Sequence, residues 1–499
     1  MTQDPTPSQS NEFPFPHVVA KLRRVELRFG NNVLIRALPA FPKSLAALKK
    51  KLQVLPKFHD RLRARSAQQR RLQLRQLARF FLALPNVCEL AELIYMEICE
   101  GYVGREPNTA AANRRMQAEY LRGTVERTTA EGGTSLKLCS ALMGIPGSGK
   151  TFAIYQIARL FPPIIFHPEY NLWQIPILIV QMPYKNNSGL NLAYAIVLAI
   201  SRLYPPGDYL NLYLTGRYSE TALLSVAKRL LEIHRVGIVI VDEAQKTGSQ
   251  PLEEFKGEPI EVQKPSRATE KWAAGILFEA STDMHVPLLL VATSELEIAL
   301  GKRASTMRRN HGNGLRHWDP LDTTIVDERP SDYDLYMSAL WEQTLLRDHP
   351  KYTLDFRNTF HYYSFGIPDF MLKLYYVVQW RALQENRETF TIADVHHVAR
   401  TYFKAVTRWT GHMRRLVEKY DEESAQFLAS KPDLAPEFGL TYGATGTAAK
   451  PLVDSRQASK EALEPPPVKG KRSSRKSENE RPPLPTAPVA HYSQIGGAQ

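Results

Sequence analysis

The middle of this 499-residue chain alternates short, continuous apolar runs with longer stretches in which apolar and polar residues recur at helical spacing. Continuous apolar runs are typical of strands that are buried on both faces of a sheet. Such runs occupy residues 141–143, 175–181, 237–241 and 286–292. Helical spacing covers residues 190–203 and 220–234, between the second run and the third. Strands separated by helices predict an α/β fold with a parallel sheet and right-handed crossovers.

The rest of the chain divides by composition. Residues 331–420 carry apolar side chains three or four positions apart, which predicts a helical lid on the sheet domain. Ten of the 35 prolines, together with many basic residues, fall in the last part of the chain and predict a disordered tail. The predicted order is a disordered start over 1–15, a basic and mostly helical region over 16–135, an α/β domain over 136–320, a lid over 331–420 and a tail over 431–499.

The first apolar run leads directly into a loop with the pattern G-x-x-x-x-G-K-[ST], which begins at Gly144 and ends at Thr151. Glycines let such a loop turn its backbone N–H groups toward phosphate oxygens, and the following helix adds the positive end of its dipole. We expect Lys150 to reach the β- and γ-phosphates of a nucleotide and Thr151 to place its hydroxyl on Mg²⁺. The predicted nucleotide contacts are Gly144, Pro146, Gly147, Ser148, Gly149, Lys150, Thr151 and Phe152.

Two adjacent carboxylates, Asp242 and Glu243, end the third apolar run. Charged groups at the end of a buried strand are costly unless they meet a cation or take part in chemistry. Asp242 is suited to hold Mg²⁺ through water, and Glu243 to polarise the water that attacks the γ-phosphate. A kinase of small molecules would not need the second carboxylate, so the pair favours hydrolysis of ATP.

The fourth apolar run ends in Thr293 and Ser294. In hydrolases with an additional strand between the phosphate-loop strand and the acidic strand, a polar residue at this position contacts the γ-phosphate or its water. Thr293 is the predicted contact and Ser294 the alternative. A strand that simply ends in a turn of small hydroxyl residues is the other interpretation.

Charge and cysteine usage narrow the class of protein. The formal net charge of +13 favours a polyanionic partner such as DNA. No apolar run approaches the roughly 18 residues of a membrane-spanning helix, and the polar N-terminus lacks the design of an export signal. Cys88, Cys99 and Cys139 show neither metal-binding spacing nor a disulfide pattern, which fits a reducing compartment.

Arginines crowd one segment of the basic region, just before the apolar run at residues 80–84. A run of this kind is either a solvated helix face or a docking surface for DNA or a protein partner, and the sequence leaves both interpretations open. The arginines are Arg61, Arg63, Arg65, Arg70, Arg71, Arg75 and Arg79.

Phosphate loop, acidic strand, threonine strand and helical lid together resemble an AAA+ ATPase. Finer motifs, within roughly residues 100–420, resemble the transposition regulators of the TnsC/TniB type. These motifs are Gly101-Tyr102-Val103-Gly104-Arg105, Asp242-Glu243-Ala244-Gln245, Met307-Arg308-Arg309-Asn310-His311-Gly312, Trp318-Asp319-Pro320, Gly366-Ile367-Pro368-Asp369, Lys373-Leu374 and Trp380-Arg381-Ala382-Leu383.

The resemblance implies a bacterial, cytoplasmic ATPase that uses ATP and Mg²⁺. Such proteins assemble as rings or filaments on double-stranded DNA without sequence specificity, and they link a target-selecting protein to the transposase. Their nucleotide sites lie between subunits of a homo-oligomer, which implies that Arg308 or Arg309 acts on the neighbouring subunit's nucleotide. The arginine that usually follows the lid glycine is absent here, and Lys373 is expected to replace it.

The DNA contacts are weakly marked, because phosphates are bound by Lys, Arg and small polar groups of many kinds. We expect them in two loops, at Lys185, Asn187 and Arg217. A long charged segment over residues 246–270 is expected to be a surface insertion of unknown role. Two other functions stay open: a replication-type helicase loader, and a nucleotide switch that docks protein partners without DNA.

Overall fold

A computed structural model describes residues 15–107 except 26 and 57, and residues 139–182, 188–215, 218–244, 286–293, 315–324, 329–411 and 414. All of them belong to one compact unit, Met1–Pro432. The predicted insertion at 246–270 and the predicted tail at 431–499 lie outside the described residues. Within the described ranges, no helix has both the length and the apolar character that crossing a bilayer requires.

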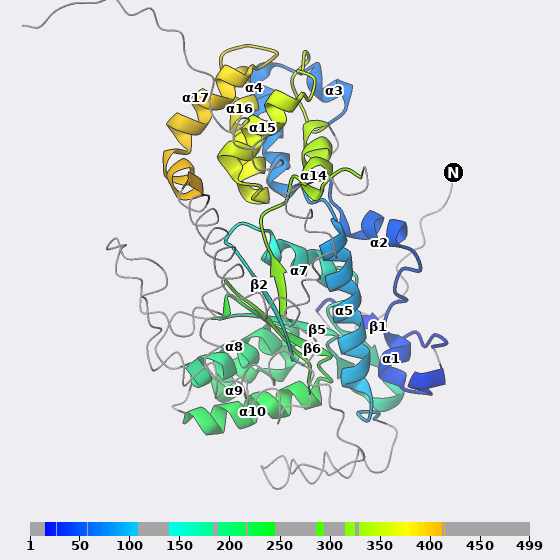
Figure 1. Cartoon of the computed structure of the whole chain (residues 1–499). Helices are drawn as coiled ribbons and strands as arrows, with labels where there is room; N and C mark the ends of the chain where they lie inside the picture. Colours follow the sequence, from blue (N-terminus) through cyan, green and yellow to red (C-terminus); the bar gives the residue numbers. More distant parts are fainter. Residues whose placement is uncertain are drawn as a thin grey trace, which may run out of the picture. The chain divides into compact units, whose positions relative to one another are not determined.

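A five-stranded parallel sheet forms the centre of the α/β part (Figure 1). In spatial order its strands are β5 (Ile177–Gln181), β6 (Ile238–Asp242), β7 (Leu288–Val291), β2 (Cys139–Gly144) and β8 (Leu315–Trp318). Every pairing between neighbours is parallel, which confirms the predicted fold class. Strand β7 lies between the phosphate-loop strand β2 and the acidic strand β6, as expected for a hydrolase with an additional strand.

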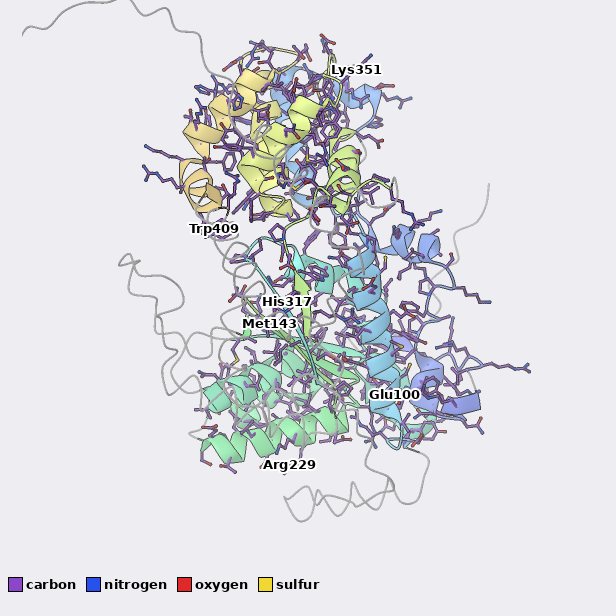
Figure 2. All side chains as sticks on the ribbon, in the orientation of Figure 1. Glu100, Met143, Arg229, His317, Lys351 and Trp409 are labelled. Atoms are coloured by element: carbon purple, nitrogen blue, oxygen red, sulfur yellow. The ribbon has the colours of Figure 1, made fainter. Side chains whose placement is uncertain are left out.

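Strand β8 was not predicted from the sequence, and it forms the edge of the sheet beside β2. Met143 of β2 pairs in register with His317 of β8, and both side chains are labelled in Figure 2. Leu315-Arg316-His317-Trp318 has no apolar run and no clear alternation, so its pairing with β2 is decided by the rest of the fold.

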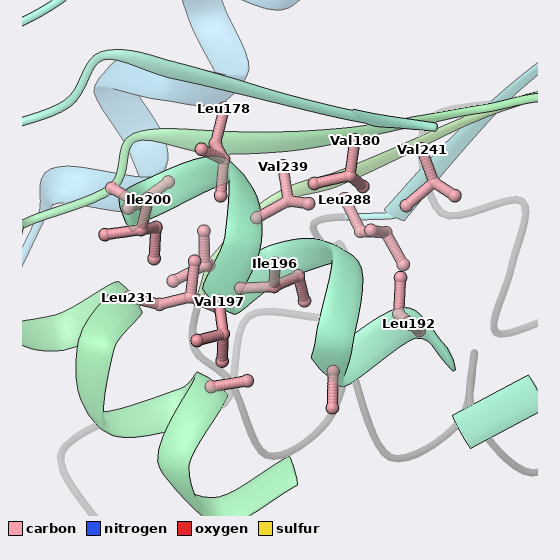
Figure 3. Packing of buried hydrophobic residues seen from close by; sticks show 14 of the residues in the cluster. Leu178, Val180, Leu192, Ile196, Val197, Ile200, Leu231, Val239, Val241 and Leu288 are labelled. Atoms are coloured by element: carbon pink, nitrogen blue, oxygen red, sulfur yellow. The ribbon is translucent and has the colours of Figure 1, made fainter. Parts of the chain in front are cut away.

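Alternate side chains of the central strand β6 enter two different hydrophobic clusters. Val239 and Val241 pack with helices α8 (Ser188–Leu203) and α10 (Glu220–Ile233) on one face of the sheet (Figure 3). Ile238 and Ile240 pack with α5 (Pro85–Tyr102) and α7 (Lys150–Ala158) on the other face. All five β6 residues are therefore buried, which explains the continuous apolar run in the sequence.

The predicted lid consists of α14 (Asp332–Trp341), α15 (Leu354–Ser364), α16 (Pro368–Gln384) and α17 (Ile392–Tyr402). These helices share a third cluster, in which Trp341 contacts several aromatic rings. Helix α17 begins with a capping box, in which the Thr391 side chain accepts from the Asp394 N–H and the Asp394 carboxylate accepts from the Thr391 N–H.

The N-terminal region contributes to both the sheet domain and the lid. Helices α1 (Val33–Ala37) and α2 (Leu45–Leu52) join α5 against the sheet. The segment between them and α5, with α3 (Asp60–Arg63), α4 (Ala67–Leu74) and the 3-10 helix η2 (Arg75–Arg79), joins the lid cluster through Leu74, Leu77 and Phe80. An isolated antiparallel bridge between Val54 and Phe81 pairs the chain where it leaves the sheet domain with the chain where it returns.

A second, three-stranded sheet and several short helices complete the described part, and the sequence patterns did not predict them. Strand β3 lies between β1 and β4, and the Phe15 ring packs on Trp173 of β4. The remaining elements are β1 (Val18–Val19), β3 (Ile165–His167), β4 (Leu172–Gln174), α9 (Tyr209–Tyr213), and the 3-10 helices Leu27–Phe29, Pro168–Tyr170 and Pro205–Gly207.

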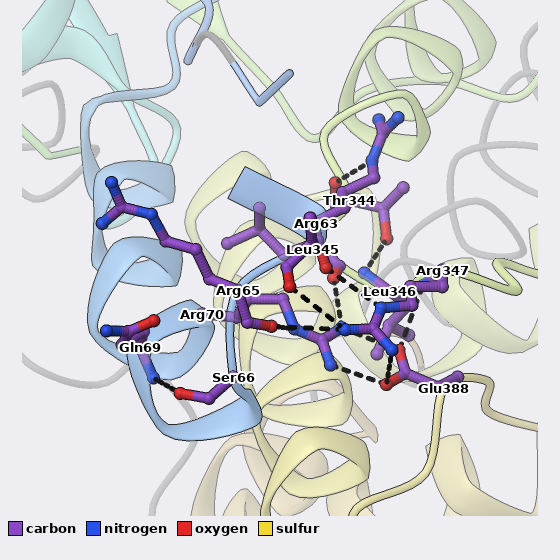
Figure 4. Close-up of polar contacts among 11 residues, drawn as sticks. Arg63, Arg65, Ser66, Gln69, Arg70, Thr344, Leu345, Leu346, Arg347 and Glu388 are labelled. Carbon is purple, nitrogen blue, oxygen red and sulfur yellow. Dashed lines mark hydrogen bonds and ion pairs between the residues drawn. The ribbon is translucent and has the colours of Figure 1, made fainter. Parts of the chain in front are cut away.

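Arg70 ties the N-terminal segment to the lid. Its guanidinium is 2% exposed and forms a bidentate pair with Glu388, at 2.7 Å from Nη1 to Oε2 and 2.6 Å from Nη2 to Oε1 (Figure 4). The same side chain donates to the carbonyl groups of Leu345 and Arg65. The arginine hydrogen bonds lower the pKa of the Glu388 carboxyl. This arginine therefore has a structural role in the folded protein.

Replacing Arg70 with Ala should destabilise the protein by about 3 kcal/mol, because the change removes the bidentate partner of a partly buried carboxylate and leaves Glu388 the longer ion pair to Arg347, at 3.9 Å. Arg75→Ala is the matched control: it removes an exposed arginine of the same segment and should change the free energy of unfolding by less than about 0.5 kcal/mol. Denaturant titrations of the full-length proteins measure both. Equal stabilities for the two variants would contradict a structural role for Arg70.

Candidate functional site

The phosphate loop connects β2 to α7, and two of its glycines adopt backbone conformations that other residues avoid. Gly147 and Gly149 have φ angles of 86° and 91°, in the left-handed region. Gly149 directly precedes Lys150, the first residue of α7. A helix that starts here directs its unpaired N–H groups into the loop, which is the arrangement that binds phosphate.

The Lys150 ammonium lies folded over the loop that it belongs to. It donates to the carbonyl groups of Gly144 and Ile145 at 2.8 and 2.9 Å, and to the Ser148 hydroxyl at 3.2 Å. Burial lowers the pKa of Lys150 to about 8, and the nearby carboxylates of Asp242 and Glu243 oppose this effect. The lysine is thus partly desolvated and close to both acidic residues.

The acidic strand meets the phosphate loop through one hydrogen bond. The Thr151 hydroxyl donates to Asp242 Oδ1 at 3.2 Å, although the two residues are 91 positions apart in the chain. The Glu243 backbone N–H donates to the same oxygen at 2.9 Å. Asp242 is 3% exposed, and its other carboxylate oxygen, Oδ2, is buried without a hydrogen-bond partner among the described residues.

This arrangement fits a divalent cation. A hydroxyl and a carboxylate are hard oxygen donors of the kind that Mg²⁺ prefers. Burial raises the pKa of Asp242, and a bound cation would stabilise its ionised form. The unpartnered Oδ2 is the group in the site that most needs such a partner.

Glu243 follows the strand in an unusual backbone conformation, with φ at 57°. A non-glycine residue in the left-handed region is strained, and such strain is often found at functional sites. Thr293 comes two residues after the end of β7, and the intervening Ala292 donates its N–H to the Leu142 carbonyl of β2. Strand order therefore places Thr293 at the same edge of the sheet as the phosphate loop and the acidic pair.

The lid touches the phosphate loop at its tip. The Asp369 backbone N–H donates to the Gly147 carbonyl at 3.2 Å, and a Cβ added to Gly147 would lie 3.0 Å from Ile367 and 3.3 Å from Asp369. The Asp369 carboxylate accepts from Lys373 Nζ at 2.5 Å, one helical turn further along α16. The sequence analysis named Asp369 as part of a motif but gave it no role in the site, because its position against the loop depends on tertiary packing.

Several predicted site residues lie outside the described part of the chain. They are Arg308 and Arg309, the alternative sensor Ser294, and the three DNA-contact candidates Lys185, Asn187 and Arg217. Their roles stay predictions.

The motif at residues 101–105 has structural contacts at the opposite end of the sheet. The Tyr102 hydroxyl donates to the Arg235 carbonyl, and Arg105 donates to the Val236 carbonyl. Arg105 also pairs with Glu232 at 3.2 Å. These contacts fix the chain just before β6, so this motif supports the acidic strand from the end that is remote from the phosphate loop.

The Trp318-Asp319-Pro320 motif lines a cavity of about 450 Å³ after strand β8. Asn86 of α5 and the first residues of α14 complete its wall. Its lining includes no residue of the phosphate loop, so the cavity is distinct from the candidate nucleotide site.

Comparisons with known proteins identify the fold. The sequence profile of the AAA domain matches residues 133–297. A comparison with curated proteins finds no match. The strand order, the phosphate loop and the profile match together show that the chain has the AAA+ P-loop fold.

Three solved structures are similar to parts of the chain. Cdc6p from Pyrobaculum aerophilum is 13% identical, with a TM-score of 0.33, over 56% of this chain and 64% of that chain. A mutant RuvB from Thermotoga maritima is 14% identical, with a TM-score of 0.26, over 57% and 65%. Drosophila ORC bound to DNA is 10% identical, with a TM-score of 0.31, over 72% and 84%. The chain thus spans less than two thirds of the length of the first two.

The lowered pKa of Lys150 predicts that nucleotide affinity depends on pH. Phosphate binding requires the charged ammonium, so affinity for MgATP should fall as pH rises through about 8, by about tenfold between pH 7 and pH 9. The free protein should respond in the opposite direction: the unfolded chain keeps this proton up to pH 10.5, so folding stability gains between about 8 and 10.5.

Lys150→Arg is the control for this pH effect, because a guanidinium stays charged over the whole range. Its affinity should be lower at pH 7 but should change little with pH. Titrations of a fluorescent ATP analogue from pH 7 to 9.5 measure both proteins. A flat profile for the unmodified protein would contradict the assignment.

Proposed function

We propose that this chain is an AAA+ ATPase that assembles on double-stranded DNA and regulates transposition. The observation that carries the ATPase part is the hydrogen bond between Thr151 and Asp242, which joins the phosphate loop to the acidic strand. A glycine-rich loop alone fits any protein that binds nucleotide. A buried acid beside the loop hydroxyl, followed directly by a second carboxylate, favours one that hydrolyses it.

Each residue then has a chemical task. Lys150 leaves the loop carbonyls and pairs with the β- and γ-phosphates of ATP. Thr151 and Asp242 hold Mg²⁺, which when bound neutralises charge on the phosphates. Glu243 orients the attacking water and accepts its proton, and Thr293 contacts the γ-phosphate or that water.

The lid supplies a further cation. Lys373 is proposed to take the place of the missing lid arginine. In this structure its ammonium forms an ion pair with the Asp369 carboxylate. Exchange of that carboxylate for the γ-phosphate would report the nucleotide state to α16, because Asp369 itself is bonded to the phosphate loop. Arg308 or Arg309 is proposed to act on the nucleotide of the neighbouring subunit in a homo-oligomer.

The DNA and transposition parts rest on sequence. The net charge of +13 supports a polyanionic partner. The resemblance to TnsC/TniB-type regulators supports a link between a target-selecting protein and a transposase, with DNA contacts at Lys185, Asn187 and Arg217. A helicase loader of the replication type and a DNA-free nucleotide switch are the alternatives, and DNA binding separates the last from the other two.

Glu243→Gln should bind ATP normally but hydrolyse it at least about 100-fold more slowly, because the amide cannot accept the proton of the attacking water. Lys150→Ala should instead lose nucleotide binding. Steady-state turnover and equilibrium binding, measured on both variants, separate the two roles. Normal turnover by Glu243→Gln would show that the base lies elsewhere.

Duplex DNA should bind tightly with a non-hydrolysable ATP analogue and weakly with ADP, with little preference for sequence. The logarithm of the binding constant should fall with the logarithm of salt concentration by about 0.9 for each phosphate neutralised. Anisotropy titrations of two unrelated duplexes at several salt concentrations measure this. Equal DNA binding with ATP analogue and with ADP would show that nucleotide does not control DNA binding. No DNA binding in either state would favour the DNA-free nucleotide switch.

Transposase capture distinguishes a transposition regulator from a helicase loader. The complex of this chain, duplex DNA and ATP analogue should retain a transposase. The same complex formed with ADP is the control and should retain none. Capture of a replicative helicase in place of the transposase would select the loader.

A further inference from the structure

Six of the seven arginines in the arginine-rich segment that sequence analysis left open separate into two groups in the structure, and the seventh, Arg71, is half-buried. Arg63 and Arg70 turn toward the lid, where Arg63 donates to the Thr344 carbonyl and Arg70 pairs with Glu388. Four others are exposed, and we call them the arginine face: Arg61, Arg65, Arg75 and Arg79.

Two of these arginines share one helix face. Gln68, Leu72, Arg75 and Arg79 recur every three or four residues along α4 and η2, whose buried positions are Arg70, Leu74 and Leu77. Arg61 lies on α3 and Arg65 in the bend that leads into α4. Leu72 is 68% exposed, so nothing in the described part of the chain covers this side. α4 and η2 together extend over about 20 Å.

No carboxylate of the described residues balances the arginine face. The one acidic residue from 58 to 84 is Asp60, and its carboxylate is already bonded to Arg63 at 2.9 Å. Figure 4 shows Arg65 bonded to its neighbours through its backbone carbonyl, which accepts from Arg70 and Arg347. None of the four guanidinium groups has an ion pair among the described residues.

We infer that the arginine face binds the sugar–phosphate backbone of duplex DNA, as a second contact surface besides the loops of the AAA+ domain. The inference rests on the proposed function. Exposed arginines before and after α4, with the exposed amides Gln68 and Gln69 on the helix between them, are the donors that phosphate oxygens accept from. Duplex DNA carries one charge per roughly 1.7 Å of its axis, so a face of this length meets several phosphates.

The anchoring of the segment gives this surface a link to ATP. α4 and η2 pack on α16, whose first turn is bonded to the phosphate loop at Gly147 (Figure 1). Arg70 and Glu388 hold the segment to the lid. A lid that shifts when nucleotide binds therefore carries the arginine face with it, and the phosphate contacts change with the nucleotide state.

The test replaces all four arginines of the face with Gln in the full-length protein. Bound to ATP analogue, this variant should show a log–log salt slope for duplex DNA that is shallower by about 0.9 for each contacting arginine, up to about 3.6 for the four. Replacing the same four with Lys should restore most of the slope, because phosphate contacts need charge more than shape.

The matched control removes four exposed cations from other places, as Arg202→Gln, Lys351→Gln, Arg400→Gln and Lys404→Gln. It lowers the net charge equally, and it should leave the slope within about one unit of the unmodified value. ATP hydrolysis without DNA should be unchanged in all three variants, since none of these residues belongs to the nucleotide site. This measurement also shows that the variants fold.

Three results would overturn the inference. The first is an unchanged salt slope for the Gln variant while the unmodified protein binds DNA in an ATP-dependent way. It would show that the arginine face does not contact DNA, and it would leave the proposed function intact. The second is an equal decrease in salt slope for the Gln variant and the control, which would show that the decrease comes from net charge alone. Tighter binding of polyglutamate than of duplex DNA at one salt concentration, abolished in the Gln variant, identifies an acidic protein as the partner.

Discussion

The buried carboxylate of Asp242 is the constraint on which the rest of the site depends. It lies at the end of a strand that is covered on both faces. Among the described residues, only the Thr151 hydroxyl and the Glu243 backbone N–H donate to it, and both donate to Oδ1. A charged group in such a place is costly unless a cation or further donors compensate it. The parallel order β6-β7-β2 sets the spacing that brings this acid to the phosphate loop. The sheet and the two hydrophobic clusters hold that strand along its length, and the contacts of Tyr102 and Arg105 fix the chain just before its other end.

The N-terminal region makes the lid more than a separate helical cap. The chain leaves the sheet domain after α2, contributes Arg70, Leu74 and Leu77 to the lid, and returns to the sheet as α5. The lid in turn reaches the phosphate loop through Asp369. The phosphate loop, the lid and the exposed arginines are thus joined by consecutive packed contacts, which would be the physical basis of the proposed coupling between ATP and DNA.

Much of the fold follows from the sequence because its signals are local. The apolar runs that became β5, β6 and β7 and the glycines of the phosphate loop all act within a few residues. β8 and the sheet of β1, β3 and β4 were missed because they have no apolar run of their own. They form by pairing with strands that are distant in the sequence. The role of Arg70 was missed for the same reason: an arginine among arginines predicts exposure, and its burial depends on Leu345 and Glu388, which lie far along the chain. Asp369 likewise gains its position beside Gly147 from tertiary packing.

Electron microscopy of the full-length protein with duplex DNA and a non-hydrolysable ATP analogue tests the central claim most directly. The account predicts a closed ring or a helical filament around the DNA, with each nucleotide held by Lys150, Thr151 and Asp242 of one subunit and reached by an arginine of the next. The same mixture with ADP should contain dispersed protein and bare DNA. Isolated monomers on or off the DNA in both nucleotide states would contradict an ATP-controlled assembly.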